Sequence, residues 1–569
     1  MDVLSPVGGV MPKIETGIPG FDRVLGGGLP AHRSTLIIGG SGAGKTLFGI
    51  QMMANFVNTT GKNALFISFE EHPEDLIKNV EHFDWNMRQN VKDNKIVIMD
   101  ARLSPNATFM GQIDLDGMMR IIAAQVNRTK AEFLVIDGLD LLLSMQPNQH
   151  LILQQMFALD RFLRDQQLST IITIKSHDFT NGVSVHSAQY VVDCVIELDR
   201  RLETDVAVST LRVIKSRGAS VVGNRIPMAI NGSGIELLTR EGGIELEHKV
   251  FYDRVGSGIE RLDTLLDGGF YRGSTILISG SPGTAKTTIG ANILEQSCKM
   301  NERALFVSFD ESEEQIVRNL ASVNIHLQTH IDSGNLKMLG MSAASSSAHH
   351  HVLKIRHLIE SFKPTMMVID PVTALVKAGG QEVANVLAEL LVDFVKSRGV
   401  TTVFTALIDS SDSSAEMTST HISTMADTWL HLTFAINGGE RNRALTIVKS
   451  RGSAHSNQVR ELLLSTEGLS LADVYTAGSQ VLMGTARIEA EGKLQLTQDR
   501  DRFEKHQRER QAKARIESIR AQMTVLENEL ASSEAEIIFD DQFEKVKDTV
   551  TERALQSILS SRYADSNPK

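Results

Sequence analysis

The chain has 569 residues, of which 42% are hydrophobic, with a formal net charge of −11 at pH 7 and two cysteines. This length predicts roughly two to four domains, and the acidic balance disfavours capture of nucleic acid by charge. Two cysteines cannot make a disulfide framework, and neither a signal peptide nor an apolar run of membrane-spanning length occurs, so we expect a cytoplasmic protein that enters no membrane.

The chain contains one long segment twice. The run TGIPGFDRVLGGGLPAHRSTLIIGGSGAGKT at 16–46 aligns without a gap with SGIERLDTLLDGGFYRGSTILISGSPGTAKT at 257–287. Three further runs, ALFISFEE, EFLVIDGLD and VIKSRG, return in the same order as ALFVSFDE, TMMVIDPVT and IVKSRG. A repeat this long indicates a tandem duplication of a whole domain rather than a solenoid.

Each copy alternates short apolar runs with helical stretches, which predicts an α/β fold with a mostly parallel sheet covered on both faces. We place the first domain at 1–245, the second at 246–484 and a helical extension at 485–569.

Each copy also carries a phosphate-binding loop between a strand and a helix. GGSGAGKT ends at Thr46 and matches G-x-x-x-x-G-K-T, whereas GSPGTAKT has Ala285 in place of the last glycine. Alanine costs little there if that residue has helical backbone angles. Backbone N–H groups and the lysine then bind the phosphates, and the threonine binds Mg²⁺. The predicted ATP-binding residues are Gly39, Gly42, Ala43, Gly44, Lys45, Thr46 and Leu47, and Gly280, Gly283, Thr284, Ala285, Lys286, Thr287 and Thr288. A purely structural second loop is the alternative.

Carboxylates follow two of the apolar strands in each copy. Asp137 and Asp370 end strands as a Walker-B acid does, so we predict that they bind Mg²⁺ together with Thr46 and Thr287. A helix cap is the alternative for both. A pair of acids follows the preceding strand, and we predict that one member of each pair acts on the nucleophile while its neighbour points elsewhere. These pairs are Glu70 and Glu71 in the first copy and Asp310 and Glu311 in the second. The start of the next helix is the alternative, and the return of the pair at the same place in both copies favours catalysis.

Basic residues two apart precede a glycine in both copies. They are Lys215 and Arg217 in the first and Lys449 and Arg451 in the second. We predict that these finger residues reach ATP in a neighbouring subunit, which requires a ring; a solvated strand edge is the alternative. The run 349–351 is three histidines, which we interpret as a capped, exposed helix start and not as a metal site.

The composition changes after about residue 484 to charged, helix-forming sequence. Apolar residues there recur at alternating intervals of four and three, which places them along one face of a helix. This seam comprises Ala512, Ile516, Ile519, Met523, Leu526 and Leu530, and it continues at Ile537. This spacing predicts a coiled coil that joins copies of the chain, and a helix packed on its own domain is the alternative.

These motifs resemble the KaiC family, the double-domain RecA/DnaB-like ATPases of the circadian clock in cyanobacteria. The similarity covers roughly 10–480 and rests on GFDRVLGGGLP, GGSGAGKT, SFEEHPEDLIKN, VIDGLD and KSRG, on their second copies, and on THISTMADT at 420–428. It implies RecA-like domains in a two-tiered ring of six subunits, with ATP and Mg²⁺ at the subunit interfaces. The first domain would hydrolyse ATP, and the second would be a serine/threonine autokinase and autophosphatase.

The phosphoacceptors that the resemblance implies are Ser423 and Thr424. The first copy has Gln189 and Tyr190 at these places. Glutamine cannot receive a phosphoryl group, and Tyr190 would place its oxygen too far out. The neighbouring hydroxyls are alternatives: Ser413, Ser414, Thr418, Ser419 and Thr420.

The coiled-coil extension is absent from the cyanobacterial pattern and is similar to a variant in other bacteria. It would join two hexamers into a dodecamer and make an activator similar to KaiA unnecessary, whereas the resemblance implies a partner similar to KaiB. Two other functions stay open: a DNA-handling ATPase similar to RecA or RadA, and a scaffold that holds inert ATP.

Overall fold

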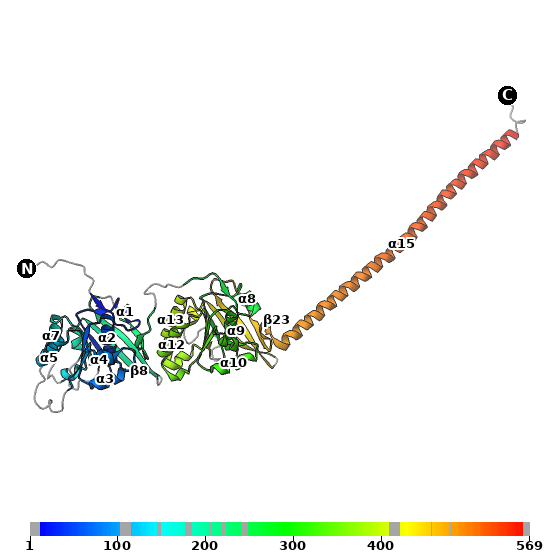
Figure 1. Ribbon diagram of the computed structural model, residues 1–569. Helices are drawn as coiled ribbons and strands as arrows, with labels where there is room; N and C mark the ends of the chain where they lie inside the picture. Colours follow the sequence, from blue (N-terminus) through cyan, green and yellow to red (C-terminus); the bar gives the residue numbers. More distant parts are fainter. Residues whose placement is uncertain are drawn as a thin grey trace, which may run out of the picture. The chain divides into compact units, whose positions relative to one another are not determined.

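The computed structural model describes residues 12–102, 115–144, 149–176, 185–203, 206–218, 223–240, 249–408, 422–437, 439–456, 458–477 and 480–561 (Figure 1). The chain divides into two units. One comprises Met1–Ile436 and Arg441–Asp473, and the other comprises Asn437–Glu440 and Val474–Lys569.

The first half forms a nine-stranded sheet with the order β11-β10-β9-β8-β3-β7-β6-β4-β5. The strands from β8 to β5 in this order are parallel, and β9, β10 and β11 continue the sheet in antiparallel fashion. Its strands are β3 (Ser34–Gly39), β4 (Asn63–Ser68), β5 (Ile96–Asp100), β6 (Ala131–Asp137), β7 (Ser169–Lys175), β8 (Cys194–Glu203), β9 (Val206–Ser216), β10 (Arg225–Asn231) and β11 (Gly234–Leu237).

The helical elements of this half are α1 (Phe21–Val24), α2 (Lys45–Thr60), α3 (Pro73–Val80), α4 (Met87–Lys92), α5 (Leu115–Thr129), α6 (Asp140–Leu143), α7 (Gln149–Asp165) and the 3-10 helix η2 (Val185–Tyr190). A two-stranded sheet pairs β1 (Lys13–Ile14) with β2 (Leu29–Pro30).

The second half repeats this topology with the order β16-β15-β17-β18-β14-β19-β20-β21-β22. Its strands are β14 (Thr275–Gly280), β15 (Ala304–Ser308), β16 (Leu336–Gly340), β17 (Met366–Asp370), β18 (Thr401–Leu407), β19 (Thr428–Asn437), β20 (Glu440–Ser450), β21 (Arg460–Ser465) and β22 (Gly468–Asp473). The small sheet pairs β12 (Arg254–Val255) with β13 (Phe270–Tyr271). The helices are α8 (Glu260–Leu265), α9 (Lys286–Lys299), α10 (Glu313–Ala321), α11 (Leu327–Asp332), η3 (Ala343–Ser345), α12 (Ala348–Phe362), α13 (Ala374–Arg398) and α14 (Ile422–Met425).

The central strands are apolar on both faces because helices cover both. In β3, Leu36 packs into one hydrophobic cluster and Ile37 into another, and the neighbouring residues Leu134 and Val135 of β6 divide in the same way. Two successive buried residues on opposite faces are what a parallel sheet between helices requires. The predicted α/β fold with duplicated, mostly parallel sheets is confirmed. The antiparallel strands β9–β11 and β20–β22 extend each sheet on one side.

The unit at the C-terminus contains a small hairpin, β23 (Tyr475–Ala477) with β24 (Gln480–Leu482), and the single helix α15 (Gly484–Ser561). The helix has 78 residues, and none of its side chains, all of which the structure describes, is buried. The Thr485 backbone N–H near its start donates to Glu440. The predicted helix is therefore present. The coiled coil stays a prediction, because it needs a second chain.

Among the described residues, no helix combines the length and the apolar character that crossing a bilayer requires.

Candidate nucleotide sites

The first phosphate loop connects β3 to α2 at the carboxyl edge of the parallel strands. Gly42 and Gly44 have φ angles of 71° and 97°, a backbone region that glycine adopts without strain. The Lys45 ammonium donates to the carbonyls of Gly39 and Gly40 at 3.0 and 2.9 Å. Burial lowers the pKa of Lys45 from its ordinary value. The loop thus presents a desolvated cation and a helix N-terminus to one place, which suits a phosphate.

The second loop, between β14 and α9, repeats this arrangement with one correction to our expectation. Lys286 donates to the carbonyls of Gly280 and Ser281, both at 2.9 Å. Ala285, however, does not have helical backbone angles: it lies at φ 76° and ψ 31°, in the left-handed region. The cause is the loop itself, since Gly44 occupies the same place in the first copy with φ 97°. The second loop therefore carries strain that the first avoids.

Each loop threonine is bonded to the acid that ends the Walker-B strand. Thr46 donates to Asp137 at 2.9 Å, and Thr287 donates to Asp370 at 2.6 Å. A second threonine, Thr173 or Thr405, donates to the other oxygen of each acid. Burial raises the pKa of Asp137 to about 6 and raises that of Asp370, although the threonine bonds oppose the shift.

This donor set fits Mg²⁺. A hydroxyl and a carboxylate are the hard oxygen ligands that Mg²⁺ prefers. Burial raises the pKa of both carboxylates, so a cation bound beside either one would stabilise its charged form. Thr46 with Asp137, and Thr287 with Asp370, are the residues that would hold the ion. When bound, Mg²⁺ would neutralise charge on the phosphates.

The structure separates the two acids of each pair. Glu70 lies against Gly138, the residue after the Walker-B acid Asp137: a Cβ added to Gly138 would be 2.8 Å from the Glu70 Cγ. Glu70 also forms an ion pair of 2.6 Å with Lys175. Glu71 instead accepts from Asn79 of α3 at 3.0 Å. The second copy repeats the outer contact, since Glu311 accepts from Asn319 at 3.0 Å.

The inner acid of the second copy is Asp310, which directly follows Phe309, and the Phe309 backbone N–H donates to the Asp370 carbonyl at 2.9 Å. The first member of each pair therefore lies at the nucleotide edge. The second member is bonded to the helix that follows.

The finger residues bind carbonyl oxygens of their own chain. Lys215 donates to the carbonyls of Gln189 and Val192 at 3.1 and 2.7 Å. Arg217 forms an ion pair of 3.6 Å with Asp193. Burial lowers the pKa of Lys215 from its ordinary value, and the pKa of Lys449 is lowered for the same reason.

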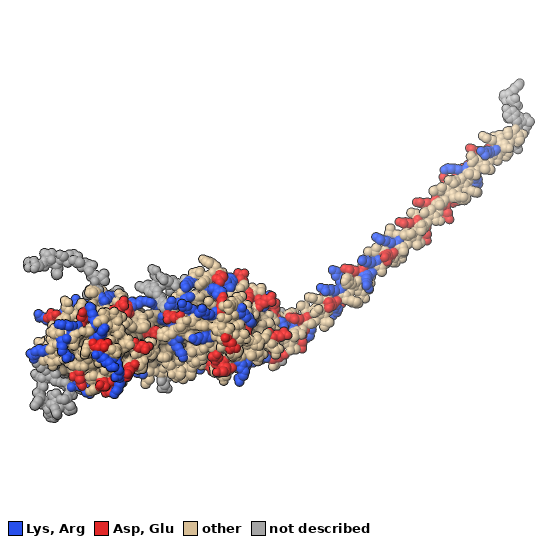
Figure 2. Space-filling model, viewed as in Figure 1, with Lys and Arg blue, Asp and Glu red and all other residues tan. Residues whose placement is uncertain are grey.

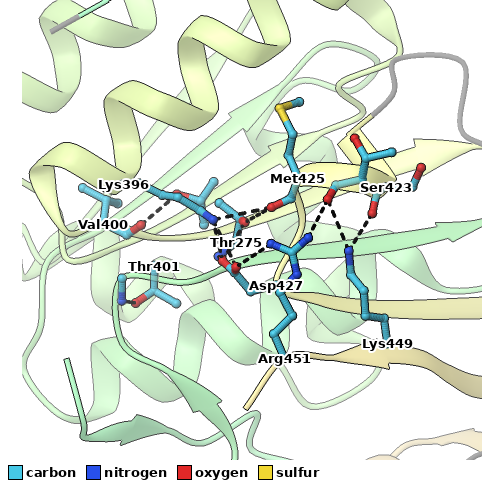
Figure 3. A network of polar contacts seen from close by, with 12 residues as sticks. Thr275, Lys396, Val400, Thr401, Ser423, Met425, Asp427, Lys449 and Arg451 are labelled. Atoms are coloured by element: carbon cyan, nitrogen blue, oxygen red, sulfur yellow. Dashed lines mark hydrogen bonds and ion pairs between the residues drawn. The ribbon is translucent and has the colours of Figure 1, made fainter. Parts of the chain in front are cut away.

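In the second copy, the finger residues bind what we call the acceptor turn, residues 422–427 (Figure 3). Lys449 donates to the Ser423 carbonyl and Arg451 to the Thr424 carbonyl, both at 2.9 Å. The Ser423 side chain is only 7% exposed, whereas Thr424 is exposed. The two hydroxyl residues and the two cations thus form one hydrogen-bonded cluster.

The acid at the base of this cluster was missed in the sequence. Asp427 accepts from the Thr275 backbone N–H at 2.9 Å and forms an ion pair of 2.9 Å with Lys396 (Figure 3). Burial would raise its pKa, but the bonds from Thr275 and Lys396 prevail and lower it. Asp193 has the same role in the first copy, at 2.5 Å from Arg164. The signal was available, since SAQYVVD and HISTMAD both end in aspartate.

The prediction for the histidine run 349–351 was correct for the helix cap and wrong for the exposure of the side chains. Ser347 caps α12 by accepting from the His350 backbone N–H, as predicted. The prediction of an exposed run was wrong, because His349 and His351 are each only 2% exposed. Their faces of α12 turn into the core, where His351 packs edge-on against Phe309. The alternative acceptors Ser413, Ser414, Thr418, Ser419 and Thr420 lie outside the described residues.

Comparison with known proteins agrees with this geometry. A model of the KaiC ATPase family matches residues 14–242 and again 255–479. The chain is 36% identical to a circadian clock protein KaiC2 of Synechocystis sp. over 84% of each chain. It is 31% identical to a circadian clock oscillator protein KaiC of Parathermosynechococcus lividus, over 87% of this chain and 92% of the relative. With the family matched once in each half, this chain belongs to the KaiC family of ATPases.

Proposed function

We propose that this chain is a circadian-clock-type ring ATPase that phosphorylates itself. Its first domain hydrolyses ATP, and its second is a serine/threonine autokinase and autophosphatase whose acceptors are Ser423 and Thr424. The two domains are residues 1–245 and 246–484. This proposal joins the family membership to the geometry of the two sites.

One observation carries the kinase assignment. Both halves hold a phosphate lysine, a Walker-B acid and a pair of finger residues in matching places, but the residues that the fingers bind differ. In the second half these are Ser423 and Thr424, and in the first they include Gln189. Gln189 cannot accept a phosphoryl group, and Tyr190, which Arg217 binds, would place its oxygen too far out. In this proposal water is therefore the acceptor of the first half.

The chemistry follows from the site. The hydroxyl oxygen of Thr424 or Ser423 bonds to the γ-phosphorus of ATP in the neighbouring subunit, the bond to the β–γ bridging oxygen breaks and ADP leaves. The hydroxyl proton passes to a carboxylate at the nucleotide edge, and we assign this role to Asp310. In the first domain water takes the place of the hydroxyl and Glu70 accepts its proton, so the products are ADP and phosphate.

The proposal requires a ring, because the finger residues serve the ATP of a neighbour. We propose a hexamer, joined to a second hexamer through α15. A partner similar to KaiB fits the family, and an activator similar to KaiA is not needed. On the face in view in Figure 2, lysines and arginines are interspersed with acidic residues and form no continuous basic surface. This supports a function without nucleic acid.

The test is the intact mass of the full chain during a day with Mg-ATP. The parent protein should gain steps of about 80 Da, one for each phosphate. The double variant Ser423→Ala/Thr424→Ala should gain none. The matched control Thr418→Ala/Thr420→Ala, from the same stretch of sequence, should gain mass like the parent.

No mass step in the parent, with ATP still consumed, would remove the kinase and leave a plain ATPase. Phosphate on the double variant would move the acceptors elsewhere. Turnover that rises with single-stranded DNA and falls with salt would favour a DNA-handling ATPase instead.

A further inference from the structure

The two nucleotide sites differ in one charged residue beside the inner acid. The last residue of β7 is Lys175, which pairs with Gly39 of the central strand β3. In the second sheet the equivalent last residue of β18 pairs with Gly280 and is Leu407. The two halves therefore share the phosphate loop, the Walker-B acid and the outer acid, but only the first has a cation at this place.

Lys175 lies among carboxylates. Its ammonium is 2.6 Å from Oε1 of Glu70, and its backbone N–H donates to Asp140 at 3.2 Å. The hydrogen bond that Lys175 donates to Glu70 is the main reason that the pKa of Lys175 is raised. The other cation of the site, Lys45, is occupied by carbonyls of its own loop. Without Lys175, Glu70 would face the negative charges of Asp137 and Asp140 with no cation bonded to it.

The ion pair also fixes which oxygen of Glu70 is available. Lys175 holds Oε1, so Oε2 is the oxygen left to accept a proton from water. Gly138 allows this position, because any side chain there would collide with the Glu70 Cγ. A carboxylate held by an ion pair on one side and by the Walker-B loop on the other has little rotational freedom, and such restraint is a recognised source of rate.

We propose that Lys175 is a positioning residue for ATP hydrolysis in the first domain, where it holds Glu70 against the nucleotide edge. The inference rests on the proposed function, in which Glu70 acts on water. The second domain has Leu407 at this place and a shorter acid, Asp310, so its inner acid is not held in this way. Lys175 thus distinguishes a site built for water from a site built for a protein hydroxyl.

The test uses the full chain with Lys286→Ala in every protein, so that turnover comes from the first domain. Lys175→Leu, which installs the second domain's residue, should lower kcat by about tenfold or more, with KM for Mg-ATP changed less than about threefold. Lys175→Arg should recover most of kcat, because it keeps the charge. Lys62→Leu removes an ion pair of equal length, to Glu132, elsewhere in the same domain and should leave kcat unchanged.

A second comparison separates positioning from a structural effect. In a Glu70→Gln background, Lys175→Leu should cost nothing further in kcat, since the group that it positions is gone. Lys175→Leu turnover equal to the parent, an Arg variant as slow as the Leu variant, or an equal loss in the Gln background would each overturn the inference alone. A parent protein without any turnover would overturn the proposed hydrolysis as well.

Discussion

Ala285 holds a backbone conformation that alanine adopts at a cost of about 1–2 kcal/mol. The loop imposes it, because the residue before the phosphate lysine must turn through the left-handed region in both copies. Ala285→Gly should therefore stabilise the second domain by about 1 kcal/mol, after the greater chain entropy of glycine is subtracted.

The chain supplies a reporter for this measurement. It has two tryptophans, and Trp429 is buried in the second sheet, where its indole N–H donates to Ser279 at 2.7 Å. In a Trp85→Phe background, urea unfolding followed by fluorescence reports on this sheet. The converse change, Gly44→Ala in the first loop, should destabilise its own domain. A lower urea midpoint for Ala285→Gly would contradict the assigned strain.

The burial of His349 leads us to predict that the second domain loses stability in acid. Its side chain is buried, its Nδ1 has no hydrogen-bond partner among the residues that the structure describes, and burial lowers its pKa from 6.5 to about 4. The unfolded chain therefore binds a proton near pH 6.5 that the folded chain takes up only near pH 4. The stability is full above pH 6.5 and falls as the pH drops from 6.5 toward 4.

At pH 5 this histidine alone should cost about 2 kcal/mol relative to pH 7. Urea unfolding of the Trp85→Phe protein at the two pH values measures the loss. His349→Leu should remove this part of the pH dependence. An equal loss in both proteins would assign the acid sensitivity to other groups.

At the residue scale, sequence spacing predicts the groups whose role is local. Lys45 and Thr46 follow a strand and begin a helix, so one stretch of sequence determines their position. Lys175 was not predicted, because its meeting with Glu70 depends on how β6 pairs with both β4 and β7. The predicted exposure of the histidine run was wrong for a related reason, because a cap at the start of a helix does not reveal which of its faces packs on the core.

At the scale of elements, the acceptor turn is anchored by one aspartate, Asp427, which contacts three other elements of the second domain. Asp427 joins β14 through Thr275, α13 through Lys396 and the end of β20 through Arg451. Asp427→Asn keeps the size of the side chain but removes the charge that both cations face. We expect a loss of about 1–3 kcal/mol in the second domain, because hydrogen-bonded ion pairs that are partly buried have this value.

A double-mutant cycle checks the assignment. Asp427→Asn and Lys396→Met should each destabilise the domain, and the double variant should be less destabilised than their sum by about 1 kcal/mol. Additive effects would mean that the two side chains do not depend on each other. Urea unfolding with Trp429 as the reporter provides the values, since this residue is two positions from Asp427.

The elements themselves were largely predictable. Continuous apolar runs such as TLII and FLVI, set between helical stretches, indicate central strands of a covered sheet, and each run has a counterpart in the other copy. The antiparallel extension β9–β11 was not predicted as such, because its strands alternate buried and exposed residues and follow hairpins rather than helices. Their direction depends on which strands pair, and a local sequence pattern does not specify this.

At the scale of the whole molecule, α15 presents a seam of apolar residues that the described part of the chain leaves exposed. Ile516, Ile519, Met523, Leu526, Leu530 and Ile537 are between 47% and 67% exposed. Side chains of this size and spacing are stabilised when a second helix covers them. We therefore expect Leu526→Asp to halve the mass of the assembly, because it buries a charge in every paired seam.

Val525 provides the matched control, since it is adjacent, apolar and 57% exposed, but lies outside the seam. Val525→Asp should leave the mass unchanged in sedimentation or light scattering. If both variants had the mass of the parent protein, α15 would not be what joins its copies. The heptad spacing predicted this seam, but the number of chains follows from contacts that a single sequence does not contain.

The hydrogen bonds from Lys449 and Arg451 to the acceptor turn have a consequence for communication around a ring. The same two cations hold the hydroxyl residues of their own chain and are proposed to reach the ATP of the next. Drawing them toward that phosphate would loosen the turn that carries the acceptors. Filling a nucleotide site and freeing the hydroxyl that will use it would then be one event, shared by two subunits. In such a ring the functional unit of phosphorylation would be the interface between two chains rather than the single chain.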